Sequence, residues 1–223
     1  MSAFSSSRRR LRDAVRTPFI TASSNQFAFS HGHVARVSLR SELPELALIN
    51  TFLAPAECAS LIDLSESRLL QSCVIDPTSG GLKESASRTS YDVSFASGET
   101  ALLTTIEERI AFVCNWDLAK STGIQVIRYL PGQKFSPHFD YLNPNAIGIG
   151  VKQRLASVLI YLNDVDAGGA TSFPDAGISV SPMAGAALYF AYRTPRRASM
   201  TYHSGEPPGH GAVKWLAVKW LTV

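Results

Sequence analysis

From Gly123 onward the chain alternates short apolar segments with turn-forming residues, and no other feature restricts the possible folds so strongly. Glycine, proline and asparagine clusters such as Pro131-Gly132 and Gly168-Gly169 mark the turns. The segments between them predict eight strands, at 124–129, 136–141, 154–162, 170–173, 178–181, 186–191, 200–203 and 214–222. Short strands at this spacing favour a double-sheet jelly roll.

Two helices and a short strand at 46–50 are predicted before these strands. Residues 55–66 carry a proline in the first turn, which is typical of a helix start. Residues 99–114 repeat apolar side chains every three or four positions, at Leu103, Ile106, Ile110 and Val113. Such a stripe packs on another apolar surface, which the strands supply. We therefore predict a mainly β fold with flanking helices and a double-stranded β-helix core, a jelly roll of the cupin-like kind.

The first 40 residues differ from the rest of the chain. Between Ser5 and Arg16 serine and arginine dominate, and Asp13 is the only acidic residue. We predict a basic, flexible N-terminal tail over 1–40 and one folded domain over 41–223. An organelle transit peptide has a similar composition. A cytoplasmic location is therefore the main expectation, and organelle targeting is the alternative.

Composition argues against several classes of function. The formal net charge of +3 at pH 7 is small for a protein whose main role is to bind nucleic acid. No apolar run reaches the roughly 18 residues that cross a membrane, and the opening lacks the apolar core of a secretory signal. The cysteines Cys58, Cys73 and Cys114 form no metal-binding pair and are expected to be reduced thiols. We expect neither nucleic acid nor membrane as a partner, and the oligomeric state stays open.

His138-Phe139-Asp140 is the first candidate for chemistry. On a strand, residues i and i+2 point to the same face, so the imidazole and the carboxylate can address one metal ion. His203 lies next to another predicted strand end, from which a jelly roll could return it to this pair. Two histidines and one carboxylate leave open positions on a metal, which suits non-haem iron(II), although zinc accepts similar ligands. From these three residues alone, a metal site and a hydrogen-bonded His–Asp pair are equally open.

Lys214 supplies a second signal. In the last predicted strand it shares a face with Leu216, Val218 and Trp220. If this more apolar face points into the barrel, the ammonium is directed inward, and a buried cation needs an anion. No acidic residue of the strand can pair with it, whereas a bound dicarboxylate would. The alternative places Lys214 at the barrel mouth, where its flexible stem reaches solvent.

Further motifs follow one another in a fixed order along the chain. They are Gln125-Val126-Ile127-Arg128-Tyr129, Gly132-Gln133-Lys134-Phe135, Pro137-His138-Phe139-Asp140-Tyr141, Arg154-Leu155-Ala156, Leu159-Ile160-Tyr161-Leu162-Asn163-Asp164-Val165, Gly168-Gly169-Ala170-Thr171-Ser172-Phe173-Pro174, His203-Ser204-Gly205, Lys214-Trp215 and Lys219-Trp220. In this order they resemble the core of the prolyl 4-hydroxylase-type Fe(II)/2-oxoglutarate-dependent dioxygenase family. The resemblance covers about residues 46–223, so it identifies 41–223 as a dioxygenase domain.

The resemblance implies a role for individual residues. The implied ligands of Fe(2+) are His138, Asp140 and His203. The implied ligands of the distal carboxylate of 2-oxoglutarate are Lys214, Tyr129 and Thr171. The two hydroxyls suit this role because each can donate to an anion, although a core aromatic at 129 and a plain strand residue at 171 are the alternatives. O2 is the second implied cosubstrate, and ascorbate is left open as a further cofactor.

The substrate side departs from the family pattern. Arg154 matches a substrate-binding position and Trp220 could wall the pocket, although a packing role accounts for either residue as well. The glutamate common after the double glycine is Ala170 here, and the histidine often found two residues beyond the last Lys-Trp pair is Thr222. We therefore expect hydroxylation of a free amino acid or other small metabolite. Hydroxylation of peptidyl proline is the alternative.

The reaction implied by the resemblance couples oxidative decarboxylation of 2-oxoglutarate with hydroxylation of an unactivated C–H bond. The carboxylate of Asp140 favours hydroxylation, because related halogenating enzymes lack it. A non-catalytic metal-binding jelly roll, as sensor or structural protein, is the competing class, but it leaves an inward Lys214 without a role. A zinc hydrolase is disfavoured because no general base stands at a defined spacing from the ligands. Residues 76–90 are expected to form a mobile loop that closes over the substrate around Gly80-Gly81.

Overall fold

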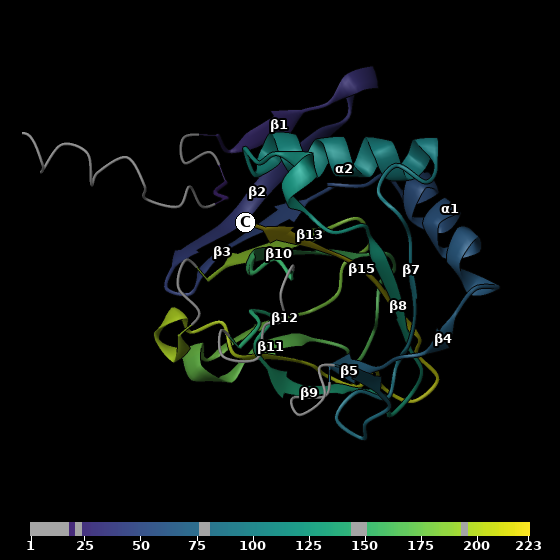
Figure 1. Ribbon diagram of the computed structural model, residues 1–223. Helices are drawn as coiled ribbons and strands as arrows, with labels where there is room; N and C mark the ends of the chain where they lie inside the picture. The colour runs from purple at the N-terminus through teal and green to yellow at the C-terminus, as the bar shows by residue number, and fades with distance from the viewer. Residues whose placement is uncertain (1–17, 21–23, 76–80, 144–150, 193–195) are drawn as a thin grey trace, which may run out of the picture.

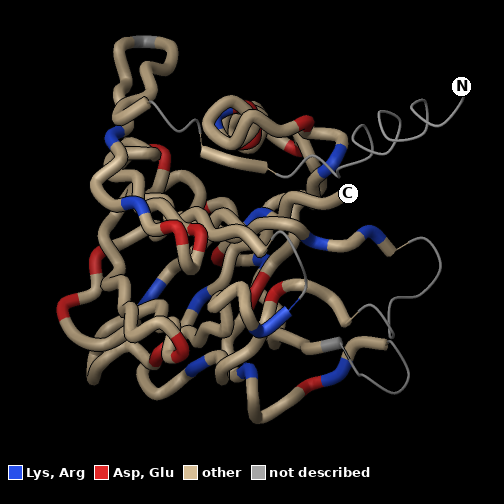
Figure 2. The backbone as a smooth tube through the Cα atoms, turned by 90° about the vertical axis from the view of Figure 1, so that its left-hand side faces the viewer, with Lys and Arg blue, Asp and Glu red and all other residues tan. Residues whose placement is uncertain are grey.

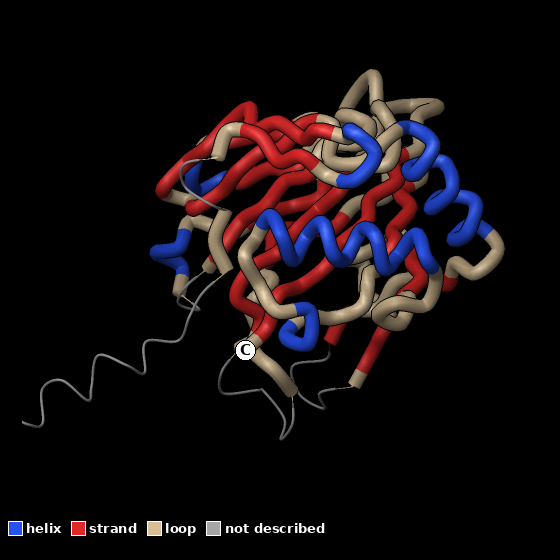
Figure 3. The backbone as a smooth tube through the Cα atoms, turned by 90° about the horizontal axis from the view of Figure 1, so that it is seen from above, coloured by secondary structure: helices blue, strands red, loops and turns tan. Residues whose placement is uncertain are grey.

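The computed structural model describes residues 18–20, 24–75, 81–143, 151–192 and 196–223, which form two facing sheets with helices on one side (Figure 1). The helices are α1 (Pro55–Glu66) and α2 (Ala101–Val113), with short 3-10 turns η1 (Ser30–Gly32), η2 (Leu118–Lys120), η3 (Pro174–Ala176) and η4 (Arg197–Ser199). In Figure 1 α2 lies above the larger sheet and the smaller sheet lies below it, and Figure 3 shows α2 crossing the strands.

The sheets are antiparallel throughout their recorded pairings. The nine-stranded sheet has the order β1 (Gln26–Ala28), β2 (Val34–Glu42), β3 (Glu45–Asn50), β13 (Ala187–Ala191), β10 (Arg154–Tyr161), β15 (Lys214–Thr222), β8 (Gln125–Tyr129), β7 (Tyr91–Ser94) and β4 (Leu70–Gln71). The four-stranded sheet has the order β12 (Ile178–Val180), β11 (Thr171–Phe173), β14 (His203–Gly205) and β9 (Phe135–His138), and a separate hairpin joins β5 (Val74–Ile75) to β6 (Leu82–Lys83). The predicted mainly β fold with a jelly-roll core and flanking helices is confirmed.

Two apolar cores hold these layers together. The helix-side core contains the predicted stripe of α2, whose four apolar residues are at most 1% exposed. The core between the sheets takes Leu216 and Val218 from β15, while Trp215 and Ala217 of the same strand enter the helix-side core. This alternation places every second residue of β15 in the space between the sheets, as predicted.

A buried ion pair crosses the helix-side layer. Lys219 Nζ on β15 lies 2.8 Å from Glu107 Oε1 on α2, and these side chains are 1% and 3% exposed. The other oxygen of Glu107 accepts hydrogen bonds from Ser97 Oγ and Gly98 N. This network supplies a counter-charge for Lys219, which lies on the face of β15 opposite Lys214.

The expected tail boundary near residue 40 is wrong. β1 and β2 belong to the nine-stranded sheet, and β2 pairs with β3 from Arg36↔Asn50 to Glu42↔Glu45. Backbone hydrogen bonds hold this polar segment, while most of its side chains remain exposed near the edge of the sheet. Residues 1–17, for which the tail was also expected, lie outside the described residues.

Two strands near the candidate site differ from their predicted ends. β9 ends at His138 instead of residue 141, because its partner β14 begins opposite His138 and offers no further backbone partner. Asp140 therefore lies in a bend and not on a strand. β14 begins at His203 instead of residue 200, because η4 and the left-handed Met200 (φ 58°) occupy the preceding positions.

The expected loop at 76–90 is ordered in its described part. β6 pairs with β5, and residues 87–89 run beside β9. Ser136 N donates to Ser87 O at 2.7 Å, and Thr89 N donates to Lys134 O at 3.0 Å. Gly80 of the expected Gly80-Gly81 hinge lies outside the described residues, as do residues 76–79 of the loop.

Charged positions are interspersed along the described chain. Figure 2 shows lysines and arginines alternating with aspartates and glutamates, without one continuous stripe of a single sign in that view. Among the described residues, no helix has both the length and the apolar character to cross a membrane.

Candidate metal and cosubstrate site

Three side chains able to bind a metal meet at one end of the small sheet. His138 is the last residue of β9, and it pairs directly with His203, the first residue of β14. Asp140 Oδ1 lies 3.4 Å from His138 Nε2, and Asp140 Oδ2 lies 3.9 Å from His203 Nε2. One ligand atom from each side chain lies within 4.8 Å of the others. The predicted cluster is therefore assembled in space.

Backbone carbonyls orient both imidazoles. His138 Nδ1 lies 2.9 Å from Ser136 O, and His203 Nδ1 lies 3.0 Å from Thr201 O. Because a carbonyl can only accept, each Nδ1 carries the proton and donates it, which leaves the Nε2 lone pair free for a metal. Phe135 also stacks on the His138 ring, with 3.6 Å between the ring centroids.

The charges of the cluster match the same role. Burial, followed by the nearby His138, lowers the pKa of His203 to about 4, so this imidazole is neutral at pH 7. Burial alone would raise the pKa of Asp140, but His203, His138 and Arg154 together hold it well below its usual range. Asp140 is therefore an anion beside the neutral imidazole of His203, as a site for a divalent cation requires.

A hydrogen bond from β10 fixes the carboxylate. Ser157 Oγ donates to Asp140 Oδ2 at 2.5 Å, and Tyr192 Oη lies 3.1 Å from Ser157 Oγ. Sequence analysis missed both residues. Ser157 is the one polar side chain within the run from Leu155 to Ile160, and such an interruption in a buried strand could have indicated a polar contact.

Lys214 is directed inward, which is the first of the two alternatives that the sequence left open. It is 0% exposed and lines the same cavity as the metal-ligating cluster. Its Nζ has no hydrogen-bond partner among the described residues. Burial lowers the pKa of Lys214 to about 7, although Glu206 opposes this change. A cation without a bonded partner at the end of a cavity fits an anionic ligand.

The two predicted hydroxyl donors lie near this lysine. Tyr129 pairs with Lys214 across β8 and β15, and its ring centroid lies 5.3 Å from Lys214 Nζ. Thr171 Oγ1 accepts a hydrogen bond from Tyr161 Oη at 2.9 Å, so its own proton remains for another acceptor. Both Tyr129 and Thr171 line the cavity. Tyr161, which the sequence analysis did not single out, therefore orients Thr171.

Arg154 and Trp220 stack on one another beside the cluster. The Arg154 guanidinium carbon lies 3.7 Å from the Trp220 ring centroid, and Arg154 Nη1 donates to Asp140 O at 3.3 Å. Trp220 lines the cavity, and its Nε1 has no hydrogen-bond partner among the described residues. The sequence left open whether Arg154 and Trp220 pack against other residues or bind substrate. The structure shows that they pack on each other and also lie beside the metal cluster.

Arg88 is a further cavity residue that the sequence analysis did not assign. Its guanidinium carbon lies 5.0 Å from the centroid of Phe135, the ring that stacks on His138. Its Nη2 is 3.0 Å from Asp92 Oδ2. Arg88 thus supports the ring that stacks on a candidate metal ligand.

The donor set fits the implied cofactors. Two imidazole nitrogens and one carboxylate oxygen suit Fe(2+), and they would hold the ion from one side. The unpartnered ammonium of Lys214, with the Thr171 hydroxyl nearby, suits the far carboxylate of a dicarboxylic acid.

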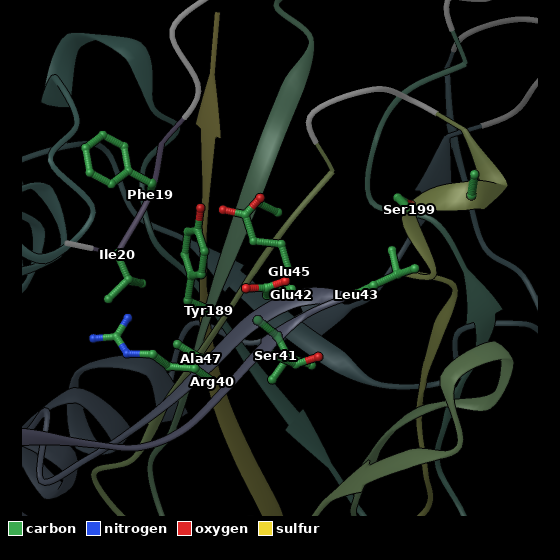
Figure 4. Close-up of a pocket in the computed structure, with 13 residues that line it drawn as sticks. Phe19, Ile20, Arg40, Ser41, Glu42, Leu43, Glu45, Ala47, Tyr189 and Ser199 are labelled. Atoms are coloured by element: carbon green, nitrogen blue, oxygen red, sulfur yellow. The ribbon is translucent and has the colours of Figure 1, made fainter. Parts of the chain in front are cut away.

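A second hollow lies between Ile20 and the β2–β3 turn (Figure 4). Arg40, Glu42 and Glu45 border it, and Tyr189 closes one side. None of the described lining residues is a histidine or a cysteine, so this hollow offers no comparable metal site.

Comparison with known proteins gives a consistent result. The family description "2OG-Fe(II) oxygenase superfamily" matches residues 124–222. A probable prolyl 4-hydroxylase 3 of Arabidopsis thaliana is 33% identical over 201 residues, covering 81% of this chain and 70% of the plant protein. The prolyl 4-hydroxylase subunit alpha-1 of Rattus norvegicus is 32% identical over 184 residues, covering 80% of this chain and 34% of the rat protein.

A solved structure shares the arrangement. The viral collagen prolyl hydroxylase of Paramecium Bursaria Chlorella virus-1, in complex with 2OG, aligns with a TM-score of 0.64 and 26% sequence identity. The alignment covers 80% of this chain and 96% of the viral chain.

Proposed function

Because the chain belongs to the prolyl 4-hydroxylase-type 2OG-Fe(II) oxygenases, we propose that it hydroxylates proline residues within a peptide. The observation that carries the site assignment is the buried, unpartnered Lys214 ammonium in the cavity that holds His138, Asp140 and His203. The substrate assignment is supported by the relatives, which are described as prolyl 4-hydroxylases.

The family defines the cofactors. The chain is a 2-oxoglutarate-dependent oxygenase that works with Fe(2+), 2-oxoglutarate and O2. The bound iron supplies the oxygen chemistry, in which 2-oxoglutarate is decarboxylated to succinate while a C–H bond is hydroxylated. The protein contributes ligand geometry, orientation and a cavity shielded from water. Ascorbate as a further cofactor stays a prediction.

The proposed roles follow from the contacts. His138, Asp140 and His203 would hold the iron through two Nε2 atoms and a carboxylate oxygen. Lys214 would hold the distal carboxylate of 2-oxoglutarate, and hydroxyl donors on either side would complete this contact. These donors are Tyr129 and Thr171, which line the same cavity. In this arrangement the keto acid end of the cosubstrate would remain for the iron.

The substrate would approach beside Arg154 and Trp220. Arg154 contacts the backbone of Asp140, so it can relate the position of a substrate to that of the metal. Thr222 pairs with Arg154 across β15 and β10, where the family pattern often has histidine. The expectation of a free amino acid or other small metabolite rested on this replacement and on Ala170 in place of the usual glutamate. The relatives support peptidyl proline better.

A comparison of substrates tests the proposal. The purified chain with Fe(2+), 2-oxoglutarate and O2 is offered either a proline-rich peptide or a panel of free amino acids that includes L-proline. We expect succinate formation and a peptide heavier by one oxygen atom only with the peptide. The His138→Ala protein, which loses an iron ligand, is the inactive control. Turnover with a free amino acid and none with the peptide would reject the peptidyl assignment but retain the oxygenase chemistry.

A further inference from the structure

Residues of the large sheet hold Asp140 in place, in addition to its contacts with the two histidines. Ser157 lies on β10 with its side chain in the same inward row as Leu159 and Tyr161, and it is 0% exposed. Its hydroxyl reaches Asp140 Oδ2 at 2.5 Å. The large sheet therefore supplies the hydrogen bond to the carboxylate, while the small sheet supplies both histidines.

The direction of the hydrogen bonds follows from the groups themselves. An ionised carboxylate only accepts, so Ser157 must donate its single proton to Asp140. Tyr192 Oη lies 3.1 Å from Ser157 Oγ, and with that proton already used Tyr192 must donate to Ser157. Tyr192 is 1% exposed, and burial raises the pKa of its hydroxyl well above the usual value, so the proton is retained.

This series of hydrogen bonds, from Tyr192 through Ser157 to Asp140, occupies one oxygen of the carboxylate. Oδ2 accepts from Ser157, while Oδ1 faces His138 Nε2 at 3.4 Å. The backbone of the same residue is held separately, because Arg154 Nη1 donates to Asp140 O at 3.3 Å. Asp140 lies in a bend beyond the end of β9, where no strand partner fixes it, so these contacts from β10 set its orientation.

We infer that Ser157 and Tyr192 are positioning residues that hold Asp140 with one oxygen turned to the iron. This inference rests on the proposed function, since it concerns the same metal site. Positioned in this way, Asp140 would offer one oxygen to the iron and leave room for the cosubstrates. Neither residue touches the metal, so neither is itself a catalytic residue. Hydrogen-bonded partners of this kind commonly contribute about 10–100-fold to metal affinity.

The test measures Fe(2+) binding without turnover. Wild type, Ser157→Ala and Tyr192→Phe are titrated anaerobically with Fe(2+), and the absorption band of the iron–2-oxoglutarate complex is recorded for each protein. We expect the dissociation constant for Fe(2+) to rise about 10–100-fold in Ser157→Ala, with a smaller rise in Tyr192→Phe. We also expect the band to shift or broaden.

Two matched controls separate positioning from packing. Ser65→Ala removes another fully buried serine hydroxyl, which bonds to Leu61 O in α1. Tyr189→Phe removes the hydroxyl of another buried tyrosine, which lies on β13 and bonds to Pro18 O. Neither Ser65 nor Tyr189 lines the cavity that holds the metal cluster, so both controls should bind Fe(2+) as wild type does.

The outcomes are distinguishable. If Ser157→Ala does not fold, Tyr192→Phe decides, because it removes one hydroxyl and keeps the ring. Fe(2+) affinity and band equal to wild type in the folded variants would overturn the inference and leave the proposed function intact. Failure of the wild-type protein itself to bind Fe(2+) would reject the metal site and the inference with it.

Discussion

Replacing Lys214 by methionine should stabilise the protein in the absence of 2-oxoglutarate and weaken its binding of that cosubstrate. The side chain is 0% exposed, its Nζ has no hydrogen-bond partner among the described residues, and burial lowers its pKa from 10.5 to about 7. Because each pH unit corresponds to about 1.4 kcal/mol, a charged Lys214 costs the folded state at most roughly 5 kcal/mol. Methionine keeps most of the volume, so we expect a net gain of about 2–4 kcal/mol near pH 6.5.

The sign of the pH dependence follows from proton binding. Between pH 7 and pH 10.5 the unfolded chain keeps the Lys214 proton, whereas the folded protein loses it. The free energy of unfolding that Lys214 contributes therefore rises with pH across this window, and its penalty is fully present below pH 7. The advantage of Lys214→Met over wild type should shrink between pH 6.5 and pH 10.

Denaturant unfolding at these two pH values, with and without 2-oxoglutarate, measures both effects. Wild type should gain stability from 2-oxoglutarate by mass action, and Lys214→Met should lose about 2–5 kcal/mol of that binding energy. The control is Lys219→Met on the opposite face of β15. Lys219 is paired with Glu107, so its removal leaves a buried carboxylate without its counter-charge and should destabilise the protein by about 3–5 kcal/mol. A Lys214→Met protein that is less stable than wild type at both pH values, or that binds 2-oxoglutarate unchanged, would refute this reasoning.

Two further predictions concern the same cavity. The affinity of wild type for 2-oxoglutarate should weaken above pH 7, approaching about tenfold per pH unit, because the proposed contact needs the Lys214 ammonium, whose pKa in the free protein is about 7. Calorimetry from pH 6 to pH 9 measures this affinity, and an equal pH dependence in Lys214→Met would assign the effect to another group. His138→Ala and His203→Ala should each abolish succinate formation with little change in unfolding free energy, because both residues are proposed ligands of Fe(2+). Full activity of either variant with added Fe(2+) would contradict the metal assignment.

Local sequence patterns predicted the elements that carry strong periodicity. The helix at 55–66 was predicted with the bounds that the structure shows, and the apolar stripe of α2 packs as expected. Alternation along a single strand placed Lys214 on the face of Leu216 and Val218, although it left open whether the ammonium points inward. In each case the predicted part depends on a few consecutive residues.

Long-range pairing explains what the sequence did not reveal. β2 was assigned to a basic tail because a strand near the edge of a sheet, with exposed arginines and serines, has the composition of a solvated segment. Asp140 was expected on a strand, but β9 extends only as far as its partner β14. Ser157 and Tyr192 were missed because their contact depends on pairing between β10 and β13 and on a bend in another sheet.

The two buried lysines of β15 show how structure and function separate within one strand. Lys219 finds its anion inside the chain, at Glu107 on α2, and the sheet and helix are joined by that pair. Lys214, five residues earlier on the other face, has the same cost of burial but no bonded anion among the described residues. An unpaired buried charge lowers stability, and nothing in the packing of β15 requires a lysine at this position. In the proposed role of Lys214, the cost is offset when the carboxylate of 2-oxoglutarate enters the cavity, so the residue that weakens the empty protein would also select its cosubstrate.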